Sequence, residues 1–328
     1  RPSYGIDTIQ NLTLPYEFPT VAAYKDFTVS FPVGKIINLL DRGASFTVIA
    51  GTGTANTFNI IASTGVAQSI DLIIGDKTSV EHWGVVVGVD SGPATNAASD
   101  YCRANGTTLT AKSGVIYTTD ESLNFRSIQH VDYKAQIVGT ADFVTVFLGG
   151  DSTDVQQYYN QYVHKANRGG ASPAVRLIGS NKNTIRVDEA SIFEVYADTD
   201  SSTGGTDVYC AYNRIFVQSC TTFQINSNPS TDGTSVQWVN ENQIHLQFCI
   251  DLKVFDNGYS HNSNQFWGGN FEGGSSTIEF ETGTANTMRG VRGENSLQVI
   301  FGTNATNNNI IPDWFGFANA PDGAVILD

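Results

Sequence analysis

Charged side chains are scarce in this sequence. Asp, Glu, Lys and Arg together make up 15% of the 328 residues, against roughly 25% in an ordinary soluble domain. Basic residues are the scarcer sign, 18 against 32 acidic ones, so the formal net charge is −14. A protein that binds nucleic acid or an anionic membrane surface needs a basic face, so this balance disfavours both classes.

Helix formers, cysteines and long apolar runs are also few. Methionine occurs once, and with so few Lys and Glu a mostly helical fold is not expected. The four cysteines include no Cys-x-x-Cys pair, so no disulfide scaffold is indicated. No apolar run approaches the roughly 18 residues of a membrane-spanning helix. The chain starts at Arg1 without a signal-peptide pattern, so we expect a processed chain or a piece of a longer protein.

What the chain does contain is short strand-like runs separated by Gly, Asn, Ser and Thr. Residues 27–31 (FTVSF) and 45–50 (SFTVIA) alternate or run apolar as strands do. We therefore expect a small β-rich cap or adaptor module over residues 1–80. Residues 80–87 (VEHWGVVV) are predicted to form a strand that leads into the rest of the chain, 81–328.

One segment has a clear helical pattern, residues 93–104. One face of a helix there carries Ala94, Ala97, Ala98, Tyr101 and Cys102, and Asn105-Gly106 follows as a stop signal.

The second half contains an internal repeat, in which an Asn is followed one residue later by two mostly apolar positions. Successive copies lie 30, 29, 22, 22 and 22 residues apart. This period, with short β segments and Asn or Gly corners, indicates a β-solenoid, because the Leu pattern of a leucine-rich repeat is missing. We expect the repeat asparagines to form a corner ladder; they are Asn183, Asn213, Asn242, Asn264, Asn286 and Asn308.

The alignment of the repeats brings other positions into columns. Cys220, Cys249 and Phe271 each lie seven residues past a repeat Asn, so they should stack on adjacent rungs about 4.8 Å apart. A buried ladder of thiols and an aromatic ring is the preferred interpretation. A Cys220–Cys249 disulfide or a metal site is the alternative.

This order of features resembles the pectate-lyase-like right-handed β-helices of bacteriophage tailspikes. The similar features are the capping helix at 93–104, the entry into the first rung at 106–117 (GTTLTAKSGVIY), and the rungs 238–244 (WVNENQI) and 258–266 (GYSHNSNQF). The resemblance extends over roughly residues 20–311, which is most of the chain.

The resemblance implies an all-β chain, folded as a single-stranded right-handed parallel β-helix with a small N-terminal module and a capping helix. It further implies a homotrimeric virion appendage that acts outside the cell, at the host surface, and joins other phage tail proteins through its N-terminal module. Such proteins bind bacterial capsule or O-antigen polysaccharide, and many cleave it by hydrolysis or β-elimination. No cofactor is implied.

Two other classes share this fold. A non-catalytic receptor-binding or structural tail-fibre component is the first, since fold alone does not fix function. A secreted pectate-lyase-type enzyme is the second, and it would be a monomer with bound Ca²⁺. The sequence has no clear Asp cluster for that ion, so no metal ligands are assigned.

Glycoside hydrolysis requires two carboxylates around one sugar bond, close together for retention and further apart for inversion. Glu272 and Glu294 each lie eight residues past a repeat Asn, on adjacent rungs. Stacking would raise the pKa of one of them, as a general acid needs. Glu241 and Asp256 are further candidates, although a solvated corner or turn explains each of these carboxylates as well.

Sugar binding requires flat apolar faces with polar neighbours. Phe216, His245, Trp267 and Arg289 lie three residues past successive repeat asparagines, and their mixed polarity predicts that they face outward. The column is interpreted as a saccharide-binding strip, with an ordinary exposed or trimer-facing sheet surface as the alternative. The aromatic platforms expected from the sequence are Trp238, Tyr259, Trp267 and Trp314.

A polysaccharide lyase would instead use a base and a cation that neutralises a uronate carboxylate. His245 or His261 could be the base, with Arg289 or Arg292 as the cation.

Overall fold

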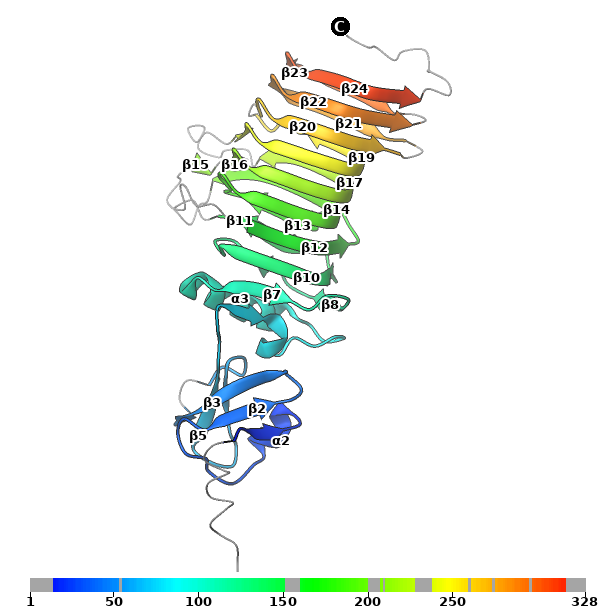
Figure 1. Cartoon of the computed structure of the whole chain (residues 1–328). Helices are drawn as coiled ribbons and strands as arrows, with labels where there is room; N and C mark the ends of the chain where they lie inside the picture. Colours follow the sequence, from blue (N-terminus) through cyan, green and yellow to red (C-terminus); the bar gives the residue numbers. More distant parts are fainter. Residues whose placement is uncertain are drawn as a thin grey trace, which may run out of the picture.

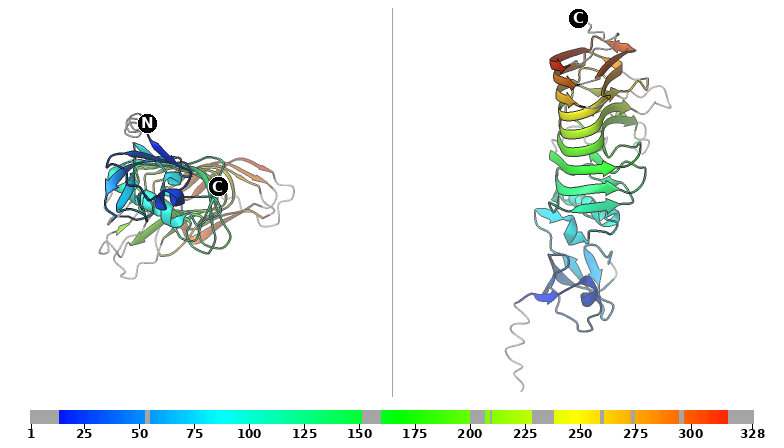
Figure 2. Two further views of the ribbon diagram at one scale, coloured as in Figure 1. Left: turned by 90° about the horizontal axis from the view of Figure 1, so that it is seen from below. Right: turned by 90° about the vertical axis from the view of Figure 1, so that its right-hand side faces the viewer.

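The computed structural model shows an elongated rod, with a small sheet at its N-terminal end and a long stack of strands beyond it (Figure 1). Turned by 90°, the rod shows its strands as successive coils of one solenoid (Figure 2). The structure describes residues 14–52, 55–150, 160–199, 207–208, 210–227, 238–258, 261–272, 275–294 and 297–316.

The N-terminal sheet has five strands in the order β1-β2-β3-β5-β4. Phe18, Tyr24 and Phe46 are buried beneath it and form its apolar core. The division of the chain at residue 80 stays a prediction. The elements of this sheet are β1 (Tyr16–Phe18), helix α2 (Val21–Lys25), β2 (Ile36–Leu39), β3 (Ala44–Ala50), β4 (Ile60–Ala62) and β5 (Gln68–Leu72).

The link into the solenoid differs from the sequence prediction. Residues Val80–Trp83 form a 3-10 turn, η1, rather than the beginning of a strand. Gly84 ends the turn in the left-handed conformation, with φ 99°. Trp83 is buried, and its indole N–H donates to Thr78 Oγ1 at 2.8 Å. Burial of this one large ring turns the chain back under the capping helix, which an apolar sequence pattern cannot distinguish from a strand.

The predicted capping helix is confirmed as α3 (Gly92–Asn105). Ala94, Ala98 and Cys102 are buried on the face that covers the first rung. Pro93 lies in the first turn and Gly106 ends the helix with φ 66°, the usual positions of these two residue types. The helix thus seals one end of the solenoid core against water.

The solenoid is a single stack of parallel strands, which confirms the predicted parallel β-helix. Along each strand, apolar residues that point into the core alternate with polar residues that face outward, as in β17. The strands of the stack are β6 (Lys77–Ser79), β7 (Thr108–Ala111), β8 (Ile116–Thr119), β9 (Leu123–Asn124), β10 (His130–Gly139), β11 (Val146–Gly149), β12 (Asn160–Arg168), β13 (Val175–Ile178), β14 (Thr184–Thr199), β17 (Arg214–Ser227), β19 (Gln243–Val254), β20 (Gln265–Phe271), β21 (Thr277–Thr284), β22 (Thr287–Glu294), β23 (Gln298–Thr306) and β24 (Asn309–Gly316).

Three shorter strands lie at the corners of the stack. Of these, β15 pairs antiparallel with the end of β14, while β16 and β18 pair with each other in parallel. They are β15 (Asp207–Val208), β16 (Cys210–Ala211) and β18 (Val239–Asn240).

The repeat asparagines form the corner ladder expected from the sequence. Asn242 Nδ2 donates to Asn264 Oδ1 at 3.0 Å, and Asn264 Nδ2 donates to Asn286 Oδ1 at 3.1 Å. Each Oδ1 also accepts the backbone N–H of the preceding ladder residue, as between Asn242 N and Asn264 Oδ1 at 3.2 Å. These amides are fully buried, so their hydrogen bonds fix the register of one rung on the next.

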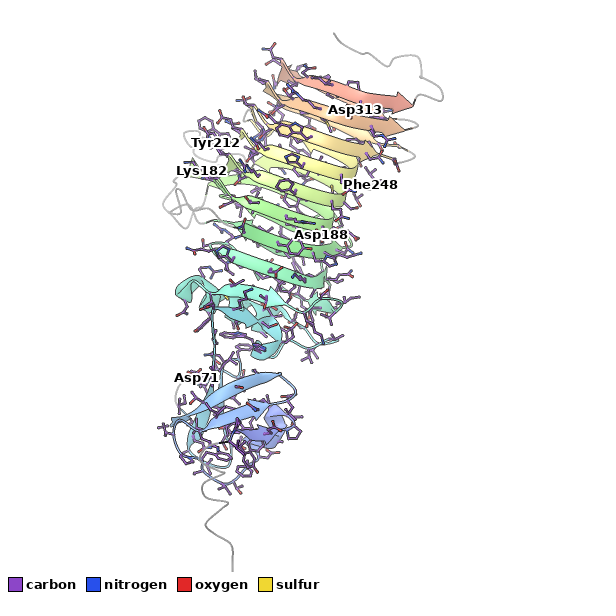
Figure 3. The ribbon with its side chains drawn as sticks, in the orientation of Figure 1. Asp71, Lys182, Asp188, Tyr212, Phe248 and Asp313 are labelled. Atoms are coloured by element: carbon purple, nitrogen blue, oxygen red, sulfur yellow. The ribbon has the colours of Figure 1, made fainter. Side chains whose placement is uncertain are left out.

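The residue before each ladder Asn adopts the left-handed backbone conformation. The φ values of these residues lie between 53° and 59°, although none is glycine. Lys182 and Tyr212 lie one above the other at the same edge of the stack (Figure 3). The ladder therefore holds a corner that these side chains would rarely adopt alone. The six residues are Lys182, Tyr212, Glu241, Ser263, Ala285 and Asn307.

Aromatic rings and thiols fill the interior in columns. Phe193 stacks on Phe223 with ring centroids 5.4 Å apart. Cys220 and Cys249 pair in register, are buried, and remain free thiols with Sγ atoms 3.4 Å apart. Of the two interpretations of this column, the buried ladder is therefore correct and the disulfide is wrong.

Acid should weaken the solenoid through His261. This side chain is fully buried, and its Nδ1 accepts the Val239 N–H at 3.1 Å. Burial lowers the pKa of His261 to about 4, partly opposed by the Asp256 carboxylate. The unfolded chain binds this proton near pH 6.5. The free energy of unfolding is therefore highest above about pH 6.5 and should fall by about 3 kcal/mol as the pH drops towards 4.

The measurement is a guanidinium unfolding series across this pH range. A His261→Asn variant keeps an acceptor for the Val239 N–H and cannot be protonated, so its unfolding free energy should depend less on pH. Equal acid sensitivity in the variant and the parent would contradict the assignment.

None of the helices among the described residues is long and apolar enough to cross a membrane.

Candidate functional site: an aromatic groove along the rungs

A row of flat side chains runs across three adjacent strands of the solenoid. Phe216 on β17 stacks on His245 of β19, with centroids 4.8 Å apart and an interplanar angle of 11°. His245 stacks in turn on Trp267 of β20, at 5.0 Å and 12°. Strand register produces this stack, because Phe216 pairs with His245 and His245 with Trp267. The rings face outward, as the sequence predicted.

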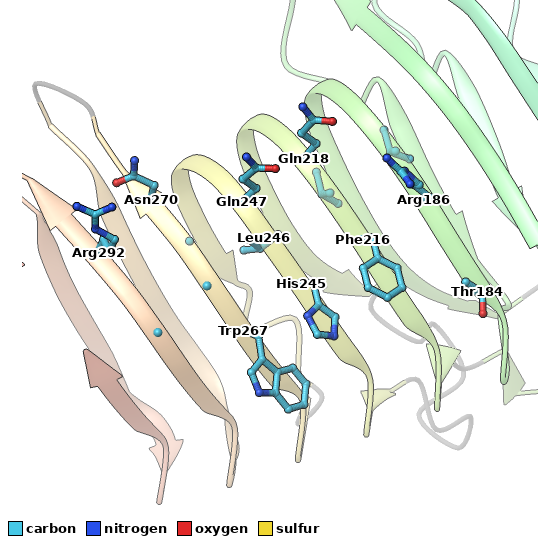
Figure 4. A pocket seen from close by; sticks show the side chains of 15 residues that line it. Thr184, Arg186, Phe216, Gln218, His245, Leu246, Gln247, Trp267, Asn270 and Arg292 are labelled. Atoms are coloured by element: carbon cyan, nitrogen blue, oxygen red, sulfur yellow. The ribbon is translucent and has the colours of Figure 1, made fainter. Parts of the chain in front are cut away.

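A second row, of amides and a guanidinium, runs parallel to the rings (Figure 4). Gln218, Gln247, Asn270 and Arg292 form it, from β17 to β22. Between the two rows lies an open groove of about 930 Å³. The groove is thus flat and apolar on one side and rich in hydrogen-bonding groups on the other.

Glycines form part of the groove floor, where side chains would otherwise stand. Gly268 and Gly269 have φ values of 74° and 103°. A Cβ at Gly268 would lie 2.5 Å from the Leu246 carbonyl oxygen, so no other residue fits without a backbone shift. At Gly290, on the next strand, a Cβ would meet only ordinary contacts, such as Asp313 Oδ2 at 3.6 Å, but the φ of 73° disfavours any other residue. Because glycines have no side chain, nothing projects from these positions into the groove beside Trp267.

Arg186 lines one end of the groove and is held in place by its neighbours. Its Nε donates to Asp188 Oδ1 at 3.2 Å, and its guanidinium lies 5.5 Å from the centre of the Tyr162 ring. Asp188 also accepts hydrogen bonds from the Tyr162 hydroxyl and pairs with His164 Nδ1 at 2.9 Å. Burial raises the pKa of Asp188, but the bonds from Tyr162, His164 and Arg186 outweigh it and hold the pKa below its usual value. Asp188 is therefore ionised and positions the Arg186 guanidinium.

The other end of the groove carries two further arginines on β22. Arg292 lines the groove itself. Arg289 is exposed and lines a smaller hollow of about 110 Å³ beside Trp267. His245 between the two ends is a neutral imidazole near pH 7, because burial between the rings lowers its pKa.

Glu272 reaches the groove through Asn270. The Asn270 amide donates to the Glu272 carboxylate, and Asn270 lines the groove. Phe271 pairs with Gly293, so Glu272 and Glu294 follow at equivalent positions of neighbouring strands. The Glu294 side chain lies outside the described part of the structure. The predicted pairing of these two carboxylates stays a prediction.

Glu241 and Asp256 lie in turns away from the groove. Glu241 is exposed in the left-handed corner that precedes Asn242. Asp256 follows the far end of β19, where its Oδ1 accepts the Gly258 N–H at 3.1 Å and its Oδ2 accepts from Asn304 Nδ2 at 2.6 Å. Backbone geometry therefore accounts for both positions.

Two carboxylates that the sequence analysis passed over do share a site. Glu279 and Glu281 on β21 both pair with Lys253 Nζ, at 3.0 Å and 2.9 Å. Glu281 also accepts the Asp256 N–H at 2.8 Å. The single ammonium offsets part of their charge, and neither carboxylate lines the groove.

The predicted binding residues divide into two groups. Trp267 and His245 line the groove and Arg289 stands beside it. Trp238 is 40% exposed, precedes the corner strand β18 and is not part of the groove lining. Tyr259 lies outside the described residues.

Several groove residues escaped the sequence analysis, namely Arg186, Gln218, Gln247 and Asn270. Arg186 belongs to the same outward column as Phe216, one strand earlier, so extending the repeat alignment by one rung identifies it. Gln218 and Gln247 lie two residues past Phe216 and His245, on the same outward face of their strands, so strand alternation identifies them as well. Asn270 lies three residues past Trp267, beyond two glycines with left-handed backbone, and the alternation does not predict its position. Among the described residues, no cluster of His, Cys, Asp and Glu could hold a metal ion.

Comparison with known proteins supports the fold. No family model matches the sequence, and no curated protein matches it either. Tailspike protein gp49 of the Acinetobacter baumannii bacteriophage Fri1, a capsular polysaccharide depolymerase, is 10% identical, with a TM-score of 0.55 over 93% of this chain and 64% of that chain. The chain therefore has the β-helix fold of a phage tailspike.

Two further solved structures are similar at lower scores. The Pantoea stewartii enzyme WceF, which modifies glycan biofilms, has 12% identity and a TM-score of 0.45 over 97% of this chain and 51% of its own. The enzymatically active domain of bacteriophage CBA120 tailspike protein 2 has 11% identity and a TM-score of 0.44, over 96% and 56%. The chain spans between half and two thirds of the length of these three proteins.

Proposed function

We propose that this chain forms the β-helical body of a phage tailspike that binds and depolymerises a bacterial surface polysaccharide, capsule or O-antigen. The observation that carries the proposal is the groove with its stack of Phe216, His245 and Trp267. Flat apolar faces suit the ring faces of sugars, and the amides opposite them suit sugar hydroxyls.

The shape of the groove favours a polymer over a small molecule. The groove is open and follows the strand stack from β14 to β22. The stack of three rings extends over two strand spacings, about 10 Å. A single sugar cannot cover a surface of this length, whereas consecutive sugars of a polymer can.

Hydrolysis is the preferred chemistry. Glu272 is hydrogen-bonded to a residue of the groove lining, and Glu294 occupies the equivalent position on the next strand. In this assignment one carboxyl group protonates the leaving oxygen, while the other acts as a nucleophile or activates a water molecule. Both residues would act on a sugar bound beyond Asn270.

A lyase is the second candidate, and the position of His245 favours it. Its imidazole stands in the groove in the neutral form, able to accept a proton from a sugar carbon. Arg186 or Arg292 would neutralise the adjoining uronate carboxylate. A non-catalytic receptor-binding protein would use the same rings to bind the polysaccharide. Neither the carboxylates of the hydrolase nor the His and Arg of the lyase would then react.

The remaining elements of the proposal come from the resemblance to phage tailspikes. The protein would act in the virion tail, at the host cell surface, as a homotrimer. Its N-terminal sheet would join other tail proteins. The acidic net charge of −14 fits a protein that works without nucleic acid.

The test is incubation of the protein with purified capsules and O-antigens from a panel of strains. Size-exclusion chromatography follows polymer length, and ultraviolet absorbance detects the unsaturated uronate that a lyase leaves. Shortened polymer without absorbance is the expected result, and shortened polymer with absorbance assigns the lyase. Binding without shortening assigns a receptor-binding protein, and no interaction with any polysaccharide contradicts the proposal.

A further inference from the structure

We infer that the groove selects an acidic polysaccharide, whose carboxylate groups bind Arg186 at one end and Arg292 at the other. The inference rests on the proposed function and names the substrate class of the same groove. It comes from the distribution of charge around the ring stack.

The residues that line the groove carry the sign of charge that is scarce in the chain. The whole chain carries −14, yet the groove lining includes two arginines, Arg186 and Arg292, and no Asp or Glu among the described residues. Two carboxylates lie next to the lining, Asp188 bonded to Arg186 and Glu272 bonded to Asn270. Arg289 adds a third cation in the hollow beside Trp267. A neutral glycan needs no such concentration of scarce basic residues, whereas an anionic glycan must overcome the repulsion of the acidic surface.

Arg186 is held ready for a carboxylate. Asp188 engages its Nε, and Tyr162 lies against its guanidinium. The two terminal nitrogens donate to no other residue in the described part of the chain. These nitrogens can bind a carboxylate with two parallel hydrogen bonds, the geometry that distinguishes Arg from Lys. The hydrogen bond to Asp188 restricts the side chain before binding, so less conformational freedom is lost on binding.

The arginines lie at a spacing that a polysaccharide can match. Arg186, Phe216, His245, Trp267 and Arg289 occupy one column of paired residues. The four strand spacings between the first and the last amount to about 19 Å. Arg292 lies on the same strand as Arg289. A chain with an acidic sugar at regular intervals can therefore place one carboxylate at each end while neutral rings cover the platforms.

The experiment measures binding by affinity electrophoresis in gels that contain one purified capsular polysaccharide or O-antigen each. The panel includes acidic polymers that contain uronate and neutral polymers. Four proteins are compared, namely the parent, Arg186→Gln, Arg292→Gln and the control Lys112→Gln, which removes an exposed charge on the loop before β8. Circular dichroism and thermal unfolding check that each variant folds.

The expected result is retardation by an acidic polymer, with a dissociation constant that rises about tenfold or more in each Arg variant and stays unchanged in Lys112→Gln. Reduction of the polymer's carboxyl groups to alcohols should weaken binding of the parent by a similar factor. Added salt should weaken it further.

Two outcomes would overturn the inference, and only one of them also overturns the proposed function. If the parent binds or shortens a neutral polymer, or binds the carboxyl-reduced polymer as tightly as the native one, the acidic class is wrong and the polysaccharide-binding function stands. If the parent binds no polymer of either class, the inference and the proposed function fail together.

Discussion

Glu272→Gln lowers the rate of polysaccharide shortening at least about hundredfold, the usual contribution of a general acid or base. The amide has nearly the shape of the carboxylate but can neither give up nor take up a proton at neutral pH. Glu272 is exposed, and the oxygen of a Gln side chain can still accept the hydrogen bond from Asn270. The substitution should therefore leave the fold unaffected. Glu294→Gln should give a loss of the same size. The measurement is the initial rate of size reduction on the polysaccharide that the parent cleaves.

Glu189→Gln serves as the matched control. Glu189 is also a surface glutamate of the solenoid, paired with Lys165 Nζ at 2.6 Å and outside the groove. Loss of such an exposed pair costs roughly 0–1 kcal/mol of stability and should leave the cleavage rate unchanged. Full activity in both Glu272→Gln and Glu294→Gln would sink the hydrolase assignment and direct attention to His245.

Asn264→Ala should lower the free energy of unfolding by about 4 kcal/mol, because two buried polar groups are left without a partner at about 1–3 kcal/mol each. Asn242 Nδ2 and Asn286 Oδ1 also lose one hydrogen bond but keep another. The Asn242 N–H loses its acceptor, Asn264 Oδ1 at 3.2 Å. The Val239 carbonyl loses its donor, Asn264 Nδ2 at 2.7 Å. The left-handed residue Ser263 also loses the ladder amide that follows it. Guanidinium unfolding monitored by tryptophan fluorescence measures the change.

Asn309→Ala is the control for the ladder. Asn309 follows the ladder residue Asn308 directly, but its side chain is exposed, so its removal should change stability by less than about 0.5 kcal/mol. Equal effects of the two substitutions would show that the ladder does not stabilise the solenoid.

The sequence predicts the solenoid well because one residue, the ladder Asn, marks each repeat. Each ladder Asn must occupy one corner of one rung, so its spacing gives the rung length and the register of every column beside it. The ring stack of Phe216, His245 and Trp267 follows from that register. Local turns are less predictable, as Val80–Trp83 shows, because burial of one Trp ring decided between a strand and a 3-10 turn.

The site is only partly predictable for a physical reason. Columns along the stack can be read from the repeat, whereas the distance between two columns depends on how each rung bends. Gln218 and Gln247 lie two residues past Phe216 and His245 and could be read from the repeat. Asn270 and Arg292 lie three residues past Trp267 and Arg289, beyond glycines with left-handed backbone, so the repeat does not place them. Glu241 and Asp256 match the chemistry of a carboxylate pair but occupy a corner and a turn. Residue type alone cannot distinguish these positions from Glu272.

The most direct test of the account compares two tryptophans that the sequence made equal candidates. Trp267 lies in the groove and stacks on His245, while Trp238 lies at the corner before β18. The measurement is the dissociation constant of each alanine variant for an oligosaccharide of the polysaccharide that the parent binds. Loss of one aromatic platform costs about 1–3 kcal/mol, so Trp267→Ala should bind about tenfold or more weakly and Trp238→Ala as the parent does. Parent-like binding by Trp267→Ala would contradict the assignment of this groove as the polysaccharide site.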